Sequence, residues 1–410
     1  MSTVRIGVLT SGGDAQGMNA AVRAVVRTAL ARGAQPYAIY EGWQGACAGG
    51  DSIKKMEWSD VSSILAEGGT VIGTARSADF RTYEGRHRAA ANLLEHGIDH
   101  LVVIGGDGSL SGTNEFRGEW AQHVAELAAE GVISAETAAA HPALIIVGLV
   151  GSIDNDMVGT DMTIGADTAL HRILDAIDQL TSTAASHQRT FVVEVMGRHC
   201  GYLPLMAAVA GGADYVFTPE DPAGPGWQDD LAEHLRLGRE AGRRESIVLV
   251  AEGAHDRDGN ELSTQLIADT IQERTGEDAR VTILGHVQRG GTPSAYDRWM
   301  STLLGYAAVQ EILESTAEDE PVILGVRRNR ITRVPLMKAV HDTRAVKDLI
   351  AAGDYAAAQA SRGSSFSSMV GINQILSTPP QLTPEPTGES KRVAILHAGG
   401  LAPGMNTAAR

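Results

Sequence analysis

The sequence predicts an α/β protein whose parallel strands are covered by helices and end in functional loops. Short runs rich in Val, Ile and Leu are typical of strands buried on both faces. Segments with helical periodicity lie between these runs, and this alternation predicts a parallel sheet with helices on both sides. Glycine-rich segments follow the runs, at the carboxyl ends where such sheets bind ligands. The predicted strands are Val4–Leu9, Leu101–Ile104, Leu144–Val147, Phe191–Val195, Ile247–Val250 and Val281–Leu284.

Helices and connecting segments can be assigned between these strands. The clearest helix is Met18–Arg32, which is apolar on one face and is followed by Gly33 as a stop. The Ala-rich and Glu-rich segment Glu119–His141 predicts one or two surface helices that carry no chemistry. Ser377–Ser390 holds four prolines and few apolar residues, which predicts an extended linker over residues 377–391.

The segment after the linker repeats the start of the chain. Residues 391–410 align without gaps to residues 4–23, and ten of the twenty positions are identical. This second copy stops just as its first helix begins. We therefore expect residues 392–410 to open a truncated second unit of a natural product about twice as long. Leu401 stands where the first copy has Asp14, so the two copies are not expected to share their chemistry.

Composition and charge limit the classes of partner. The chain has 410 residues and a formal net charge of −16, which argues against binding to nucleic acid or to an anionic membrane surface. The sequence shows no run of about 18 apolar residues and no secretory signal, so no membrane span is expected. Cys47 and Cys200 are the only cysteines, too few for a disulfide framework, which favours a reducing cytoplasm.

Two glycine-rich loops are candidates for binding phosphate groups. Ser11–Gly17 (SGGDAQG) lies between a predicted strand and a helix, where backbone N–H groups and the helix dipole favour anions. Its spacing matches neither the Walker A loop nor the dinucleotide fingerprint. Gly105–Ser109 (GGDGS) follows another strand, and the carboxylate of Asp107 could hold Mg²⁺. Plain turns are the alternative for both loops.

A third loop, Gly151–Asp156 (GSIDND), supplies carboxylates. Asp154 and Asp156 alternate, so on an extended segment they point the same way. A carboxylate beside a sugar hydroxyl can accept its proton, which is worth typically about 10²–10⁴ in rate. An Asx-type turn is the alternative.

Cationic residues gather at the predicted strand ends. In an acidic chain they suggest a site for two phosphorylated ligands, although any single one could be solvated or paired with an acid. Glu252, at another strand end, could bond sugar hydroxyls or cap a helix. The cationic candidates are Arg76, Arg189, Arg198, Arg280, His286 and Arg289.

Together these motifs resemble the ATP-dependent 6-phosphofructokinase family, from Val4 to about residue 370. The resemblance is carried by LTSGGDAQGMNAAVR, GGT with TAR, IGGDGS, GSIDNDMVGTDMTIGADTALHR, SHQRTFVVEVMGRHCGY and RVTILGHVQRGGTPSAYDR. Ser152, the Ala-rich insertion and the second copy after the Pro-rich linker resemble the duplicated, eukaryotic-type branch. Members of the short bacterial type usually have Thr at the position of Ser152 and lack the insertion.

The resemblance implies a fold of two Rossmann-like layers with parallel sheets. A larger ATP-binding domain faces a smaller sugar-phosphate domain across a cleft, and the chain crosses between them more than once. The expected organisation is a catalytic unit over 1–376, with an ATP subdomain at about 1–165 plus 289–335, a fructose 6-phosphate subdomain at about 166–288 plus 336–376, the linker 377–391 and the second unit from 392.

The resemblance also implies the reaction, which is phosphorylation of D-fructose 6-phosphate by ATP to the 1,6-bisphosphate, the committing step of glycolysis, under allosteric control. Asp107 would hold Mg²⁺, and Asp154 would take the proton of the 1-hydroxyl, with a pKa near the ordinary value of about 3.9 or below it. Arg76 and Arg198 would neutralise the migrating phosphoryl group. The residues implied to contact ATP are Gly13, Arg76, Ser77, Gly106, Asp107, Gly108 and Ser109.

A second set of residues is implied to hold the sugar phosphate. Arg189 and Arg280 match residues that the family donates to a neighbouring subunit, so the active site is expected to need at least a dimer, and a tetramer is usual. The set consists of Ser152, Ile153, Asp154, Arg189, Met196, Gly197, Arg198, Glu252, Arg280, His286, Val287, Gln288 and Arg289.

Several alternatives stay open at this point. Pyrophosphate-dependent relatives have Asp in place of Gly108 and Lys in place of Gly151, so two glycines favour ATP as the donor. NAD kinases and lipid kinases share GGDG but would leave MGRHCG and GHVQRGG unexplained. A non-catalytic half that only binds effectors is disfavoured because Asp107, Asp154, Arg76 and Arg198 are all present.

A possible effector site adds one further alternative. Arg23 and Arg27 lie one helical turn apart, so they could hold an effector phosphate at a subunit interface or be solvated surface residues.

Overall fold

The computed structural model describes residues 3–382 and 392–409. The larger of its two sheets is mixed. Within the described residues, its strands follow the order β11-β10-β5-β4-β1-β2-β3. The five central strands are parallel, whereas β3 and β11 pair antiparallel at the two edges. The strands are β1 (Arg5–Ser11), β2 (Gln35–Ile39), β3 (Ile53–Lys55), β4 (His100–Gly105), β5 (Ile145–Val150), β10 (Val322–Arg327) and β11 (Arg330–Pro335).

A smaller sheet is parallel throughout. Its order within the described chain is β7-β8-β6-β9. The strands are β6 (Thr190–Val195), β7 (Tyr215–Phe217), β8 (Ser246–Ala251) and β9 (Ala279–Ile283). The predicted α/β class is therefore confirmed. The antiparallel edge strands were not predicted, because neither β3, which is short, nor β11, which is rich in charged residues, shows a continuous apolar run. Short length and charged side chains both suit an exposed edge.

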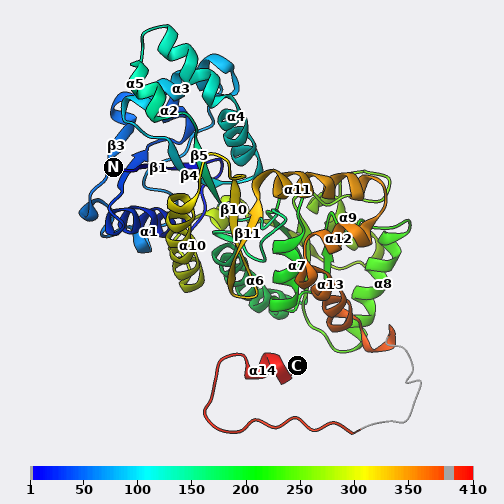
Figure 1. Ribbon diagram of the computed structural model, residues 1–410. Helices are drawn as coiled ribbons and strands as arrows, with labels where there is room; N and C mark the ends of the chain where they lie inside the picture. The colour runs from blue at the N-terminus through cyan, green and yellow to red at the C-terminus, as the bar shows by residue number, and fades with distance from the viewer. Residues whose placement is uncertain (1–2, 383–391, 410) are drawn as a thin grey trace.

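Helices cover both faces of each sheet (Figure 1). On the larger sheet, alternate residues of β1 face opposite cores. Ile6 and Val8 pack with α1 and α10, whereas Leu9 packs with α3, α4 and α11. This alternation explains why the strands are apolar at nearly every position. The helices concerned are α1 (Met18–Ala31), α3 (Tyr83–Glu95), α4 (Asp107–Ala129), α10 (Ala295–Glu314) and α11 (Leu336–Ala351).

Helix α6 (Ala166–His187) joins the two sheets through one continuous core. Ala169, Ile173 and Ile177 belong to the same buried cluster as residues of both sheets. On the smaller sheet α7 packs beside α6, and the opposite face is covered by α8 and α9. The remaining helices are α2 (Trp43–Ala48), α5 (Ala135–Ala140), α7 (Tyr202–Gly211), α8 (Trp227–Glu240), α9 (Thr264–Thr275), α12 (Tyr355–Ser361), α13 (Ser364–Ser377) and α14 (Met405–Ala409).

The structure changes the assignment of the Glu119–His141 segment. Its first part is not a separate surface helix but the second half of α4, which begins at Asp107. Phe116, Trp120 and Leu127 of this helix are buried against the larger sheet. Helix α1 begins at Met18 as predicted, and Gly33 follows it with a φ of 78°.

The carboxy-terminal predictions are covered only in part. Helix α13 extends to Ser377, and residues 383–391 of the predicted linker lie outside the described residues. In the second copy, α14 begins at Met405, which aligns with Met18 at the start of α1. The predicted subdomain boundaries stay predictions. Helix α11, assigned to the smaller unit from sequence, packs its apolar face against the larger sheet. Within the described residues, no helix is both long and apolar enough to span a membrane.

Candidate active site

The two glycine-rich loops that are predicted to bind phosphate, called the phosphate loops below, lie side by side at the edge where β1 and β4 end. These strands pair with Ser11 opposite Gly105, and the chain leaves β1 for β2 on the other side, so the loops meet at a topological switch point. Ser109 Oγ donates to Ser11 Oγ at 2.9 Å and links the loops directly. Because α4 begins at Asp107, the second loop presents the free N–H groups of a helix amino terminus.

The segment that carries Arg76 and Ser77 is tied to this edge. Thr10 Oγ1 donates to the carbonyl oxygen of Gly73, and Thr74 Oγ1 donates to that of Gly12 at 2.9 Å. Arg76 itself is exposed, and Ser77 accepts a hydrogen bond from the N–H of Phe80. The structure therefore places the predicted arginine beside the phosphate loops on an anchored segment.

Asp107 offers a partly exposed carboxylate at the start of α4. Its Oδ2 lies 3.5 Å from Nε of Arg344, whose Nη2 donates to Ser111 Oγ at 2.8 Å. Arg344, which comes from α11, was not predicted from the sequence, because no local motif marks it. A carboxylate held at the mouth of a phosphate loop is the hard oxygen donor that Mg²⁺ prefers, so Asp107 fits the predicted ion.

Gly108 and Gly151, the two glycines that bear on the phosphoryl donor, have different surroundings. A Cβ at Gly108 would meet no atom within 4 Å. At Gly151 it would lie 2.5 Å from Cε of Met18 and 3.2 Å from Cγ2 of Ile104. A side chain at 108 would therefore project into the open site, whereas one at 151 would have to displace core atoms.

Asp154 lies almost wholly buried beyond the end of β5. Its Oδ1 has no hydrogen-bond partner among the described residues. Ser152 Oγ donates to Asp156 Oδ1 and accepts from the N–H of Asp154, which fixes the loop. Ile153 is fully buried in the core, with no exposed surface.

Burial raises the pKa of Asp154 to about 6, and the neighbouring carboxylate of Asp156 adds to the rise. Arg289 and Arg198 act in the opposite direction, and Glu252 raises the pKa further. The expectation of an ordinary or lowered pKa is therefore wrong, because desolvation outweighs the arginines. At pH 7 the group is still roughly nine-tenths ionised, since the pH lies about one unit above the pKa.

The carboxyl ends of the smaller sheet bring several predicted sugar-phosphate residues together. The N–H of Met196, after β6, donates to Gln288 Oε1 at 3.1 Å. The N–H of Arg198 donates to Glu252 Oε2 at 3.2 Å. Arg198 adopts a φ of 54°, a left-handed conformation that is strained for a residue other than glycine and is commonest at functional sites.

The loop after β9 connects the two sheets. Arg289 Nη1 donates to the carbonyl oxygen of Asp14 at 3.1 Å and lies against Gly13. Gln16 Nε2 donates to the carbonyl oxygens of Gln288 and Gly290 at 3.0 and 2.9 Å. The loop after β9 therefore rests on the first phosphate loop, with His286 and Val287 exposed beside it. Gln16 was not singled out from the sequence.

Arg189 and Arg280 lie elsewhere. Both guanidinium groups pair with Oδ2 of Asp278, at 2.7 and 3.0 Å. They stand at the amino end of the smaller sheet. Arg189 precedes β6 and lies roughly 20 Å from the end of that strand, and Arg280 lies roughly 10 Å from the end of β9. Within one chain these two arginines are therefore not near Asp154.

A buried ion pair beneath the site was also missed. Arg362, from just after α12, pairs with Glu220 at 2.8 Å, and both side chains are almost fully buried. Neither residue lies in a glycine-rich loop, so no motif signals them.

Arg23 and Arg27, the residues of the possible effector site, line a hollow of about 460 Å³ between α1 and α10, together with Trp299 and Tyr306.

Comparison with known proteins agrees with this architecture. The family model described as "Phosphofructokinase" matches residues 5–312. The chain is 51% identical over 405 residues to the "ATP-dependent 6-phosphofructokinase, liver type" of Homo sapiens, and 50% identical over 409 residues to the "ATP-dependent 6-phosphofructokinase 1" of Aspergillus oryzae. These alignments cover 99% of this chain and 52% of either relative, so the chain spans about half the length of the curated relatives it matches.

A solved structure shows the same similarity. The "Structure of phosphofructokinase from Saccharomyces cerevisiae" superposes with a TM-score of 0.89 at 51% sequence identity. The superposition covers 91% of this chain and 50% of that one.

Proposed function

The chain belongs to the phosphofructokinase family, and from that premise we propose that it transfers the γ-phosphoryl group of ATP to the 1-hydroxyl of fructose 6-phosphate. The observation that carries the proposal is Asp154. Its Oδ1 is buried, has no partner among the described residues, and lies where loops from both sheets converge. An unpartnered, ionised oxygen in that position can accept the proton of a substrate hydroxyl.

The proposed roles follow from charge and position. Phosphoryl transfer passes through a loose state with charge on the equatorial oxygens, so catalysis depends mainly on positioning and on electrostatic stabilisation. Asp154 takes the proton of the 1-hydroxyl, and its raised pKa makes it a stronger base than an ordinary aspartate. Arg76 and Arg198 neutralise charge on the migrating group.

We assign ATP binding to the paired loops after β1 and β4. Gly13, Gly106 and Gly108 leave the backbone accessible to phosphates, and Ser77 and Ser109 add hydroxyl groups. Asp107 holds Mg²⁺, which neutralises phosphate charge when it is bound. ATP is preferred to pyrophosphate because the open space at Gly108 can accept a nucleotide phosphate, where an Asp side chain would repel it.

We assign the sugar phosphate to the carboxyl ends of the smaller sheet. Met196, Gly197, Glu252 and the loop after β9 form its walls, with Ser152 on the opposite side. Arg189 and Arg280 serve a neighbouring subunit, which accounts for their place at the opposite end of the sheet. Self-association, allosteric control, a cytoplasmic location and the two-subdomain division are parts of this proposal.

The test is a coupled assay for fructose 1,6-bisphosphate with the 410-residue chain, comparing MgATP with magnesium pyrophosphate. The proposal expects activity with ATP and none with pyrophosphate. Asp154→Ser should lower kcat by at least about 10² while MgATP affinity changes little. Activity with pyrophosphate would overturn the donor assignment. Failure to turn over either donor, together with tight binding of both substrates, would favour the non-catalytic alternative.

A further inference from the structure

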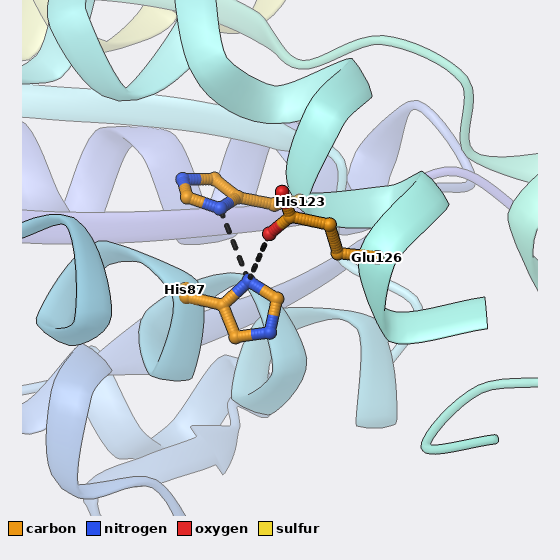
Figure 2. Close-up of side chains that lie close together, drawn as sticks. All are labelled: His87, His123 and Glu126. Atoms are coloured by element: carbon orange, nitrogen blue, oxygen red, sulfur yellow. Dashed lines mark hydrogen bonds and ion pairs between the residues drawn. The ribbon is translucent and has the colours of Figure 1, made fainter. Parts of the chain in front are cut away.

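Two imidazoles and a carboxylate gather between α3 and α4, outside the candidate active site. His87 comes from α3, and His123 and Glu126 lie one turn apart on α4 (Figure 2). Within the described ranges, this is the only group of three His, Cys, Asp or Glu residues whose ligand atoms all lie within 4.8 Å of one another. His123 is roughly 24 Å along the axis of α4 from Asp107, so the cluster is distinct from the phosphate loops.

The spacing of the cluster matches a small tetrahedral ion. The Nδ1 atoms of His87 and His123 face each other at 3.2 Å, and His87 Nδ1 lies 3.6 Å from Glu126 Oε2. Ligand atoms bound about 2.0–2.1 Å from a tetrahedral Zn²⁺ ion lie about 3.4 Å apart. The two distances from His87 are close to this value, and the ligand atoms of His123 and Glu126 lie within 4.8 Å of each other, so an ion could be bound after the side chains move closer together.

Each imidazole has a carboxylate behind it. His123 Nε2 lies 3.3 Å from Glu119 Oε2, and His87 Nε2 lies 3.5 Å from Glu130 Oε2. A carboxylate at the outer nitrogen is the arrangement that fixes the tautomer and orientation of metal-binding histidines. With the outer nitrogens protonated, both Nδ1 atoms direct lone pairs into the cluster.

The carboxylate of Glu126 is held at both oxygens. Gln122 Nε2 donates to Oε1 at 2.8 Å, and the hydroxyl of Tyr83 donates to Oε2 at 2.7 Å. These contacts orient the carboxylate beside the two rings and leave Oε2 a further lone pair for an ion.

Charge also favours a cation at this place. The ring of His123 is fully buried, so water cannot separate it from the ring of His87. Two lone pairs facing each other at 3.2 Å require a proton or a cation between them. A proton on Nδ1 of His87 would give a simple hydrogen bond, and an ion would replace that proton.

We propose that His87, His123 and Glu126 bind one Zn²⁺ ion, which clamps α3 to α4. Imidazole and carboxylate donors suit Zn²⁺, whereas Mg²⁺ prefers oxygen ligands alone. The side chains of His87 and Glu126 are partly exposed, so the ion can enter from solvent and keep one water ligand. This site is independent of the proposed reaction.

The test measures metal binding rather than activity. The 410-residue chain is freed of metal, equilibrated with Zn²⁺ in the presence of excess Mg²⁺, dialysed and analysed for bound zinc. We expect one ion per chain, and the visible absorption of four-coordinate Co²⁺ when cobalt replaces zinc. His341→Ala removes an exposed histidine of α11 and should bind like the parent chain. His87→Ala and Glu126→Gln should lose the bound ion.

Glu130→Gln distinguishes an oriented site from chance binding. It leaves all three ligands in place, and the loss of an outer carboxylate should weaken Zn²⁺ affinity about 10-fold to 100-fold. If His87→Ala fails to fold, Glu126→Gln and Glu130→Gln decide the question, because both side chains are partly exposed. A parent chain that retains no zinc, or variants that bind it as well as the parent, would overturn the proposal.

Discussion

Arg362 and Glu220 form a buried ion pair that joins the loop of Asp154 to the loop of Arg198. Arg362 Nε donates to Glu220 Oε1 at 2.8 Å, and its two terminal nitrogens donate to the carbonyl oxygens of Asp156 and His199. Glu220 in turn accepts from the N–H of Gly201. One guanidinium thus holds a loop from each sheet at a fixed distance. The pair is a positioning device, since neither side chain is exposed to a ligand.

Arg362→Ala should therefore lower the free energy of unfolding by about 3–5 kcal/mol, because it leaves the Glu220 carboxylate buried without its partner. Arg362→Lys keeps the charge but loses the planar fork. It should therefore be more stable than Arg362→Ala, yet its kcat/KM should still fall about 10-fold to 10²-fold below that of the parent chain. Chemical denaturation and steady-state kinetics measure the two effects. Arg236→Ala, which removes an exposed ion-paired arginine, is the matched control and should change stability by at most about 1 kcal/mol. Equal losses of activity in the control would contradict the positioning role.

The pKa of Asp154 predicts an unusual pH profile. A base with a pKa of about 6 is protonated and inactive below that pH, so kcat/KM should rise through an acid limb near pH 6. An ordinary aspartate would place this limb near pH 4. Asp156→Asn removes a charge that raises this pKa and should move the limb to lower pH. Initial rates from about pH 5 to about pH 8 measure it. A limb at the same pH in both proteins would show that another group controls the rate.

The same shift predicts that Asp154→Asn stabilises the protein while abolishing activity. The pKa of Asp154 is higher in the folded state than in the unfolded chain, so folding is favoured below about pH 4 and the benefit is lost as pH rises towards about 6. At pH 7 the ionised, desolvated carboxylate is a cost, and the neutral amide should raise the free energy of unfolding by about 1–3 kcal/mol. Denaturation at pH 4 and pH 7 measures the difference. The stabilisation of Asp154→Asn relative to the parent chain should shrink at about pH 4. If the variant were less stable than the parent chain at pH 7, the argument would be refuted.

Gly108 and Gly151 should respond differently to substitution. Gly108→Asp places a carboxylate in open space, so it should raise the KM for MgATP well above any change for fructose 6-phosphate and leave the melting temperature nearly unchanged. Gly151→Ala should instead destabilise the fold by about 1–3 kcal/mol, because its Cβ would press on Met18 and Ile104. Thermal melts and the two KM values separate the cases. Equal weakening of both substrates by Gly108→Asp would undo the donor argument.

The sequence predicted the parts of the fold and site that local patterns encode. The runs 4–9 and 101–104 predict strands because their side chains are apolar on both faces of the strand. The clustered glycines of Ser11–Gly17 and Gly105–Ser109 predict loops. The contacts that assemble the site are non-local. Gln16 bonds to residues more than 270 positions away, and Arg344 reaches Asp107 from α11. The raised pKa of Asp154 also depends on burial by the assembled chain, which the spacing of carboxylates does not encode.

The pairing of Arg189 and Arg280 on Asp278 yields the last prediction. Both arginines stand at the far end of the smaller sheet from Asp154, so a role in catalysis requires a second chain. Arg280→Ala should raise the KM for fructose 6-phosphate with little change in stability, since its ion pair is exposed. Mixing chains that carry Arg280→Ala with chains that carry Asp154→Asn should restore activity, because some sites would then combine an intact base with an intact arginine. Self-mixed samples of either variant are the control. If no activity returns in oligomers shown to contain both chains, the arginines do not act across subunits and their pairing with Asp278 is purely structural.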